Sequence, residues 1–417
     1  MDLCKHKHKF TAMKLKSSEP FWLVKNGLLT TYPSLREDKK VDILIVGGGI
    51  TGCLIAHQCI VQGYQTILID KLEVANGSTS ATTAMLQYEI DIPLHKLIDQ
   101  IGEKGATASY WACYRAIDKL ESISKQVKSG SGFKKKESLY FAAYKKDISW
   151  LKKEFDTRRI NGLPVDWLSS AEILERYRIT NTHGGILSHQ GGSIDAFRFT
   201  HDVLAYNNSR GLAIYDKTEI IKVKYGERGI RAWTSYGNII NAKKIIYCNG
   251  YESVNIIKDK FVKLLSTYAI VGERFDGDQS EIQELLVWNT ANPYIYLRTT
   301  DDNRILIGGG DEPFLDTARR DSLLNQKRIF LEKKLLKLLP AEDPRRTFRT
   351  DFAWAGTFGE TKDGLPYIGK HPNFPGAYFV LGFGGNGITF SITGMEMVSY
   401  MLQGKKHPLE PYYKFRR

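Results

Sequence analysis

Residues 41–52 read V-D-I-L-I-V-G-G-G-I-T-G, a short apolar strand that runs directly into closely spaced glycines. A second apolar run, residues 66–69, ends at Asp70, eighteen residues after the last of these glycines. Strand, glycine turn, helix, strand and acid in this order are typical of a βαβ unit that binds a dinucleotide. The sequence therefore predicts an α/β fold with a Rossmann-like domain.

Each glycine of this turn has a separate physical task. Gly47 permits the tight turn, Gly49 lets backbone N–H groups approach a pyrophosphate, and Gly52 lets the helix pack close to the strand. The phosphates would lie at the positive amino end of that helix, which makes its first residues, Ile50 and Thr51, candidate ligands. A glycine turn made only for packing is the alternative.

The acid at the end of the second strand narrows the choice of dinucleotide. The carboxylate of Asp70 would accept hydrogen bonds from an adenosine ribose, and its charge disfavours a 2′-phosphate. The sequence therefore predicts an adenine dinucleotide that lacks this phosphate.

Length and composition describe a globular protein of more than one domain. The chain has 417 residues, of which 42% are hydrophobic and 25% charged, and its length indicates two or three domains. The longest apolar stretch, residues 43–56, is shorter than the roughly 18–20 residues that cross a bilayer. The basic first ten residues lack the apolar core of a secretory signal, so we expect neither a transmembrane segment nor export.

Cysteine usage and charge give weaker indications. The five cysteines form no C-x-x-C pair and no metal-ligand spacing, so we expect no metal site and a reducing, cytoplasmic location. Lys and Arg exceed Asp and Glu by 59 to 46, a formal net charge of +13. A solvated surface explains this balance. Attraction of an acidic substrate, an anionic membrane or a nucleic acid is the alternative, but the basic residues are scattered among acids and we expect no nucleic-acid partner.

Hydrophobic periodicity separates nucleotide-type segments from segments rich in antiparallel strand. Helical periodicity dominates residues 93–128, and residues 214–248 suggest a meander that closes on a buried strand. Alternating strands joined by the turn 301–303 follow, and then a charged helix over 317–339. We therefore expect a Rossmann-like FAD/NAD(P)-binding domain that is discontinuous, with an inserted antiparallel-sheet substrate domain of α+β type.

The expected boundaries follow from these patterns. They are an N-terminal arm at 1–40, the nucleotide-binding domain at 41–133, 193–262 and 350–404, the substrate domain at 134–192 and 263–349, and a C-terminal tail at 405–417.

A second glycine-rich corner stands near the C-terminus. Residues 379–389 read F-V-L-G-F-G-G-N-G-I-T and lead into a final helix that ends at about Leu402. Amides at this corner would stabilise the negative charge that a flavin gains at its pyrimidine end on reduction. A nicotinamide enzyme makes no such demand. A turn that serves packing is again the alternative.

Several motifs occur together in one order. They are V-G-G-G-I-T-G with D-K at 70–71, the Ser/Thr-rich stretch 77–84, Y-C-N-G at 247–250, Y-I-Y-L-R with I-L-I-G-G-G, and T-K-D-G-L-P-Y-I-G followed by G-F-G-G-N-G-I-T. From residue 41 to about 402 the chain thus resembles the D-amino-acid oxidase/glycine oxidase (DAO) family of FAD-dependent oxidoreductases. The early P-F-W-L and Y-P-S-L look like the gamma-glutamylputrescine oxidase group. G-S-T-S-A-T-T-A-M-L-Q looks closer to bacterial members that carry a Rieske iron-sulfur domain after the flavin part.

The resemblance implies FAD, with the first glycine motif at the pyrophosphate and Asp70 on the ribose. Lys71 would flank the adenosine, Ile221 would offer its backbone to the adenine, and Asn249-Gly250 would close beneath the nucleotide. The residues implied to line the phosphates and flavin are Ser78, Thr79, Ser80, Thr82, Thr83 and Met85. Those implied to face the isoalloxazine ring are Gly384, Gly385, Asn386, Gly387, Ile388 and Thr389.

Two features of these relatives are missing from the sequence. Some attach FAD covalently through a His after the first motif or a Cys in the late W-x-G region, but here those stretches read T-S-A-T-T-A and W-A-G-T-F-G, so we expect dissociable FAD. The chain ends about fifteen residues after the last helix without the Cys/His pairs that hold a Rieske cluster. We therefore expect O2, a quinone or another carrier as electron acceptor.

The expected reaction is oxidation of a C–N bond in an amine or amino-acid-like substrate, by hydride transfer to flavin N5, giving an imine that hydrolyses. Such a reaction needs a positioned C–H bond and a dry pocket more than acid/base groups. The catalytic candidates are Tyr296, Arg298 and Trp354, with Gln87, Tyr88 and Tyr294 as further walls. Arg298 would grip a substrate carboxylate; a surface arginine on a strand edge is the alternative.

One position departs from the amino-acid oxidases that the chain resembles. There an arginine in the late W-x-G-x-R-P stretch grips the substrate carboxylate, whereas here the matching residue is Phe358. This disfavours a simple α-amino acid. It favours an amine, a larger N-substituted compound, or a substrate whose acid is held elsewhere, by Arg298 or Lys362. His183, His189 and His201 lack convergent spacing and are expected to be structural. An FAD-dependent 2-hydroxy-acid or polyol dehydrogenase, a tRNA-modifying flavoprotein of the same fold and a non-catalytic FAD-binding protein are the alternatives.

Overall fold

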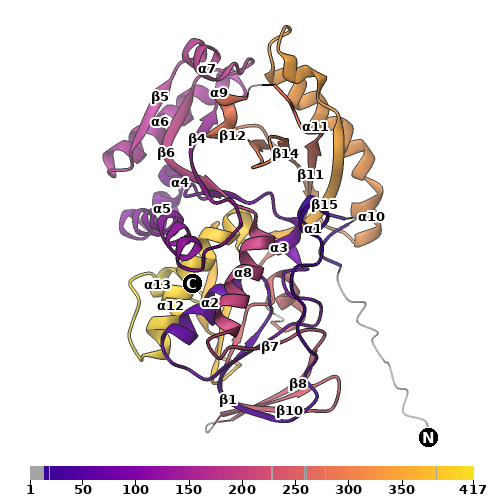
Figure 1. Ribbon diagram of the computed structural model, residues 1–417. Helices are drawn as coiled ribbons and strands as arrows, with labels where there is room; N and C mark the ends of the chain where they lie inside the picture. Colours follow the sequence, from indigo (N-terminus) through magenta and orange to yellow (C-terminus); the bar gives the residue numbers. More distant parts are fainter. Residues whose placement is uncertain are drawn as a thin grey trace, which may run out of the picture.

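The computed structural model describes residues 14–17, 19–226, 229–257, 259, 261–277, 279–381 and 383–417. Two β-sheets form the framework, one of eight strands in the lower half of Figure 1 and one of nine strands in the upper half. Both carry helices on their outer faces (Figure 1). This is the α/β fold with a second sheet that the sequence predicts.

The first sheet contains the strand of the glycine motif. Its strands are β1 (Lys39–Val46), β2 (Thr66–Ile69), β7 (Ala213–Tyr215), β8 (Ile220–Gly226), β9 (Gly229–Thr234), β10 (Ile239–Tyr247), β16 (Tyr367–Lys370) and β17 (Ala377–Leu381). They lie in the order β16-β17-β10-β1-β2-β7, and β9 joins β8 to β10. From β17 to β7 all neighbours are parallel, as in a Rossmann-like sheet.

Helix α2 (Ile50–Val61) is apolar along most of its length. It lies between α8 (Ala196–Asn208) and α12 (Gly387–Leu402), and α12 also packs against α5 (Glu103–Gln126). Because α2 is apolar on nearly every side, it is stable only when neighbours cover every side. The two glycine-rich corners are therefore brought together, since α2 and α12 each begin at one of them.

The second sheet is mostly antiparallel. Its strands are β3 (Met85–Gln87), β4 (Lys134–Phe141), β5 (Val165–Leu168), β6 (Gly185–Ser193), β11 (Lys263–Gly272), β12 (Leu285–Asn289), β13 (Ile295–Thr299), β14 (Ile305–Pro313) and β15 (Thr350–Glu360). The order is β15-β11-β14-β13-β12-β4-β6-β3, with β5 beside β6. Among the described strands of this second sheet, only β4 and β12 pair in parallel, so the predicted antiparallel sheet is in fact mixed.

The remaining helices cover the sheets or connect them. They are α1 (Phe21–Asn26), α3 (Ser78–Ala81), α4 (Leu94–Ile101), α6 (Ile148–Ile160), α7 (Ser170–Tyr177), α9 (Ser280–Gln283), α10 (Thr317–Ser322), α11 (Leu324–Leu338) and α13 (Glu410–Tyr413), and the 3-10 turns η1 (Lys145–Asp147), η2 (Gly250–Asn255), η3 (Pro344–Thr347) and η4 (Gly384–Asn386). None of the helices in the described ranges has both the length and the apolar character that a bilayer crossing requires.

Three segments differ from their predicted place. Strand β15 pairs along its length with β11, so the start of the predicted nucleotide-binding segment 350–404 belongs to the second sheet. Strand β3 likewise pairs with β6, although 41–133 was assigned to the first domain. In the segment 405–417, predicted as a tail, Tyr413 is fully buried. A chain that crosses repeatedly between two sheets cannot be divided from strand patterns alone.

Candidate active site

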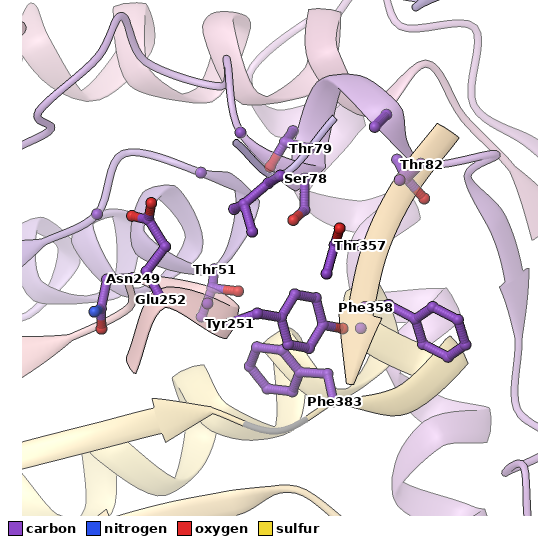
Figure 2. Close-up of a pocket in the computed structure, with 18 of the residues that line it drawn as sticks. Thr51, Ser78, Thr79, Thr82, Asn249, Tyr251, Glu252, Thr357, Phe358 and Phe383 are labelled. Carbon is purple, nitrogen blue, oxygen red and sulfur yellow. The ribbon is translucent and has the colours of Figure 1, made fainter. Parts of the chain in front are cut away.

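A single cavity of about 850 Å3 connects the two sheets. At one end it is lined by the first glycine motif, and at the other by aromatic and acidic residues of the second sheet. Figure 2 shows Ser78, Thr79 and Thr357 pointing into it, opposite the rings of Tyr251 and Phe383. The expected nucleotide site and the expected substrate walls are thus parts of one space.

The first glycine turn has the close contacts that the motif requires. Gly47 has φ of +112°, and a Cβ there would lie 2.5 Å from the carbonyl oxygen of Cys248. A Cβ on Gly52 would lie only 1.9 Å from the carbonyl oxygen of Gly47. Gly52 therefore lies behind the cavity wall, where it lets α2 approach β1, while Gly47 and Gly49 line the cavity.

The amino end of α2 faces the loop that carries α3. The N–H of Ile50 donates to Thr79 Oγ1 at 3.0 Å, and Thr51 and Ser78 line the cavity beside it. Ser78 Oγ and Asn249 Oδ1 are shielded atoms without a hydrogen-bond partner among the described residues. Since native proteins rarely leave such groups unpaired, these atoms mark places where a bound group would supply partners. The lining thus fits an FAD.

Asp70 lies at the end of β2, as predicted, and lines the cavity. Its two carboxylate oxygens accept from the N–H groups of Gly48 (2.7 Å) and Leu72 (2.8 Å), while desolvation raises its pKa to about 6. Lys71 also lines the cavity and pairs with Glu252 at 2.6 Å. Glu252, on η2, has no signal in the sequence beyond its place after the Asn-Gly turn.

The second glycine corner faces the same cavity. Asn386 Nδ2 donates to the carbonyl oxygens of Gln87 (3.2 Å) and Glu89 (2.6 Å), which ties η4 to the end of β3. The N–H of Gly385 donates to Asp91 Oδ2 at 2.8 Å. One amide that the sequence assigns to the flavin therefore has a protein partner, because the Asp91 carboxylate reaches it from the loop after β3.

Besides Gly52, two residues predicted to contact the cofactor lie outside the cavity lining. Ser80 Oγ donates to the carbonyl oxygen of Gly77 at 2.9 Å, and Thr389 Oγ1 donates to that of Asn386 at 3.0 Å. Both side chains are buried and point back into their own helical turns. The other implied contacts, including Thr82, Thr83, Met85, Ile221, Gly250, Gly384, Gly387 and Ile388, do line the cavity.

Three consecutive carbonyl groups of the cofactor-side loop are held by side chains from three separate elements. Trp354 Nε1 donates to Ala81 O (2.8 Å), Trp22 Nε1 to Thr82 O (2.7 Å), and Arg298 Nε to Thr83 O (2.7 Å). We call this arrangement, formed by Trp22, Arg298 and Trp354, the loop clamp. It holds the backbone of residues 81–83 at the cavity wall.

The prediction that Arg298 grips a substrate carboxylate is wrong, because the Arg298 side chain does not reach the cavity. Its side chain is 2% exposed and is absent from the cavity lining; it donates to Thr83, Thr299 and Ile194 carbonyl oxygens and lies over the Trp22 ring. The surface-arginine alternative is wrong as well. Arg298 and Tyr296 lie on the same face of β13. Two residues along a strand span about 7 Å, so Arg298 lies beneath α1 and not in the cavity.

The walls on the second sheet follow strand alternation. Tyr296 lies opposite Gly308, whose missing side chain makes room for the phenol ring, and its hydroxyl is 3.4 Å from Thr267 Oγ1. Phe358 and Trp354 lie on the same face of β15 and line the cavity, as do Gln87 and Tyr294. Tyr88 does not: it is fully buried on the opposite side, where its hydroxyl donates to Ser188.

An acidic residue that sequence reasoning missed stands at this end of the cavity. Asp311, near the end of β14, lines the cavity, and its Oδ1 has no hydrogen-bond partner within the described part of the chain. Desolvation, with a smaller effect from Asp91 and Glu360, raises the pKa of Asp311 to about 7. The sequence could have indicated Asp311, because it directly follows the apolar run I-L-I-G-G-G, at a strand position where an apolar residue is expected.

This carboxylate should lower the stability of the ligand-free protein at alkaline pH. The folded-state pKa of about 7 lies above the ordinary 3.8, so the free energy of unfolding falls as pH rises between these values. We expect Asp311→Asn to raise the free energy of unfolding by about 1–2 kcal/mol at pH 8 and to have little effect near pH 4. Urea denaturation of apoprotein at both pH values measures this; an equal effect at both would contradict it.

The histidines behave as structural groups. His201 is buried, and desolvation lowers its pKa to about 4, so it stays neutral. His189 is exposed and bonds both Glu137 and Asp166 at 2.8 Å. Neither of these, nor His183, lines the cavity.

Comparison with known proteins gives this cavity its context. The family model DAO, FAD dependent oxidoreductase, matches residues 42–401. YhfW of Bacillus subtilis, which is named as a Rieske 2Fe-2S iron-sulfur protein, is 22% identical over 95% of this chain and 75% of its own length. Gamma-glutamylputrescine oxidoreductase of Escherichia coli is 20% identical over 92% of this chain and 90% of its own.

Glycine oxidase of Geobacillus kaustophilus is similar in sequence and in structure. It is 23% identical over 88% of this chain and 94% of its own length. Its crystal structure covers 91% of this chain and 99% of that chain with a TM-score of 0.74, at 21% identity. The predicted fold class, family and FAD cofactor are confirmed. Because the family model spans most of its length, the chain belongs to the DAO family of FAD-dependent oxidoreductases.

Proposed function

We propose that this protein oxidises a C–N bond of an amine, giving an imine that hydrolyses. The observation that carries the proposal is the composition of the cavity beyond the nucleotide end. Trp288, Tyr294, Tyr296 and Phe358 supply aromatic walls, and Asp311 supplies a carboxylate. An amine or ammonium group finds partners in such a lining, whereas an anionic hydroxy acid would face a negative charge.

The chain's own residues would hold FAD along the cavity. Gly49, Ile50 and Thr51 offer the amino end of α2 to the pyrophosphate, and Asp70 and Lys71 lie where the adenosine would end. Ser78 and Asn249 would gain the hydrogen-bond partners that they lack. The corner at 384–388 would face the isoalloxazine ring. When bound, FAD supplies the acceptor for the two electrons that leave the substrate.

The residues of the second sheet would position the substrate and exclude water. Tyr296 and Trp354 are anchored, the first over Gly308 and the second by its bond to the Ala81 carbonyl. Fixed aromatic walls present the reacting C–H bond in one orientation without a dedicated acid or base. We therefore assign Tyr296 and Trp354 to substrate positioning, and Arg298 to the loop clamp.

The cofactor is proposed to be dissociable. The loop at 81–84 holds no histidine, and residues 354–359 of β15 hold no cysteine. Precipitation of the holoenzyme with acid should leave all of the flavin colour in the supernatant. The cysteines of the described ranges are free buried thiols, which supports a reducing, cytoplasmic location.

Anaerobic mixing of the yellow holoenzyme with candidate substrates tests the function. The panel consists of primary amines, N-methyl amino acids, D-amino acids and 2-hydroxy acids. We expect amines to bleach the visible absorbance and hydroxy acids to leave it unchanged. Bleaching by hydroxy acids alone would overturn the proposal, and re-oxidation by air or by a quinone would identify the acceptor.

A further inference from the structure

The substrate end of the cavity has an unbalanced charge. Asp311 approaches it from β14 and Asp91 from the loop after β3, and both line the cavity. The phenol of Tyr294 lies near both, since each carboxylate acts on its pKa in the same, upward direction. Glu360, at the end of β15, adds a third negative charge nearby.

The positively charged side chains nearest this end of the cavity bind other protein groups. Lys327, the cation that acts on Asp311, pairs with Glu312 at 2.6 Å and donates to the carbonyl oxygen of Gly310 at 2.7 Å. Arg320 lies behind Thr357, to which it donates at 2.9 Å, and is not part of the lining. Four lysines line the cavity: Lys14, Lys16, Lys71 and Lys222. Lys71 pairs with Glu252 beside the nucleotide motif, and none of the other three is among the groups that act on the pKa of Asp311 or Asp91.

Asp311 therefore keeps an unused hydrogen-bond acceptor at the wall of the cavity. Its Oδ1 is shielded and has no hydrogen-bond partner among the residues described. Leaving a carboxylate oxygen unpaired is costly, and a positively charged ligand group would remove that cost. Trp288, Tyr294 and Tyr296 line the same end, and aromatic rings attract ammonium groups through their faces.

The remaining neighbour at this end of the cavity is aromatic. Phe358 shares its face of β15 with Gly356, and Gly356 pairs with Thr267 of β11. The Thr267 side chain lies beside Tyr296 and Asp311. Phe358 lines the cavity and carries no charge, so it does not offset the negative charge of Asp311.

We infer that the substrate is an alkyl diamine or polyamine, in which one amine is oxidised while a second, charged ammonium binds to Asp311. The inference rests on the proposed function and adds the substrate class to it. In the reaction the neutral amine loses a hydride from its α-carbon and a proton from its nitrogen, FAD accepts the two electrons, and water hydrolyses the imine to an aldehyde and ammonia. The second ammonium is unchanged throughout.

Three five-carbon amines that differ only at the far end test this. They are 1,5-diaminopentane, 1-aminopentane and 5-aminopentanoate, whose distal groups are positive, neutral and negative. With anaerobic holoenzyme at pH 8, we expect the diamine to reach half-maximal bleaching, or half-maximal change in the flavin spectrum, at a concentration at least tenfold below the other two. The four-carbon diamine and monoamine repeat the comparison at a second length.

Two variants test whether Asp311 is responsible for the preference for the diamine. Asp311→Asn should bring the diamine to within threefold of the monoamine when both are measured in the variant. Asp156→Asn, which makes the same substitution at an exposed site outside the cavity lining, should retain the preference. Since Asp311→Asn is expected to be more stable than the parent at pH 8, misfolding does not explain a loss. The spectrum of bound FAD confirms that each variant is loaded.

The outcomes separate the inference from the proposed function. Equal response to the three amines, preference for 5-aminopentanoate, or silence of all diamines would overturn the inference. If other amines of the wider panel still bleach the flavin, the proposed function survives that result. A diamine preference that persists in Asp311→Asn would also overturn the assignment to Asp311.

Discussion

Gly52→Ala should yield a protein that binds FAD far more weakly than the parent does. A Cβ at this position would lie 1.9 Å from the carbonyl oxygen of Gly47, and this partner is backbone that no side-chain rotation can move. Relief requires α2 to move away from β1, which would displace the N–H groups of residues 49–51 from the phosphates. We expect affinity for FAD to fall at least about a hundredfold, which equals about 2.7 kcal/mol.

The measurement is titration of apoprotein with FAD, followed by flavin fluorescence. Gly130→Ala is the matched control, because a Cβ there would meet only the guanidinium of Arg198 at 3.4 Å, the far end of a flexible side chain. This variant should bind FAD as the parent does. Near-parental affinity in Gly52→Ala would show that the turn does not set the phosphate site.

Arg298→Met should destabilise the protein without changing substrate recognition. The carbonyl oxygens of Thr83 and Ile194 lose a donor inside the protein, at a cost of about 1–3 kcal/mol each. Removal of the guanidinium offsets part of this cost, because burial disfavours its charged form and lowers the pKa of Arg298 to about 10. We expect the free energy of unfolding to fall by about 2–3 kcal/mol and FAD to bind more weakly, since residues 81–83 lose one arm of the loop clamp.

Steady-state kinetics with saturating FAD separate this from a substrate role. The KM for the amine that bleaches the flavin should stay within twofold, whereas a carboxylate-gripping arginine would raise KM for amino acids by orders of magnitude. Arg159→Met is the control, because Arg159 pairs with Asp156 in an exposed bridge that contributes about 0–1 kcal/mol. A selective rise in KM in Arg298→Met would contradict the loop clamp.

The sequence by itself was sufficient for the first βαβ unit of the nucleotide-binding sheet. The strand, glycine turn, helix and acid between Val41 and Asp70 form one continuous βαβ unit, and the geometry of such a unit is local. Gly47 and Gly52 have the close contacts assigned to them because a turn this tight leaves few arrangements of the backbone. The order of motifs along the chain was likewise enough to identify the family.

Only the tertiary structure decided which side chains of the second sheet reach the cavity. Tyr296 and Arg298 share one strand face, but α1 covers the arginine and leaves the tyrosine at the wall. Asp91 and Asp311, far apart in the chain, meet because a loop and a strand end converge there. Hydrophobic periodicity tells which face of a strand a residue occupies. Which segment covers that residue depends on contacts between parts of the chain that are distant in sequence.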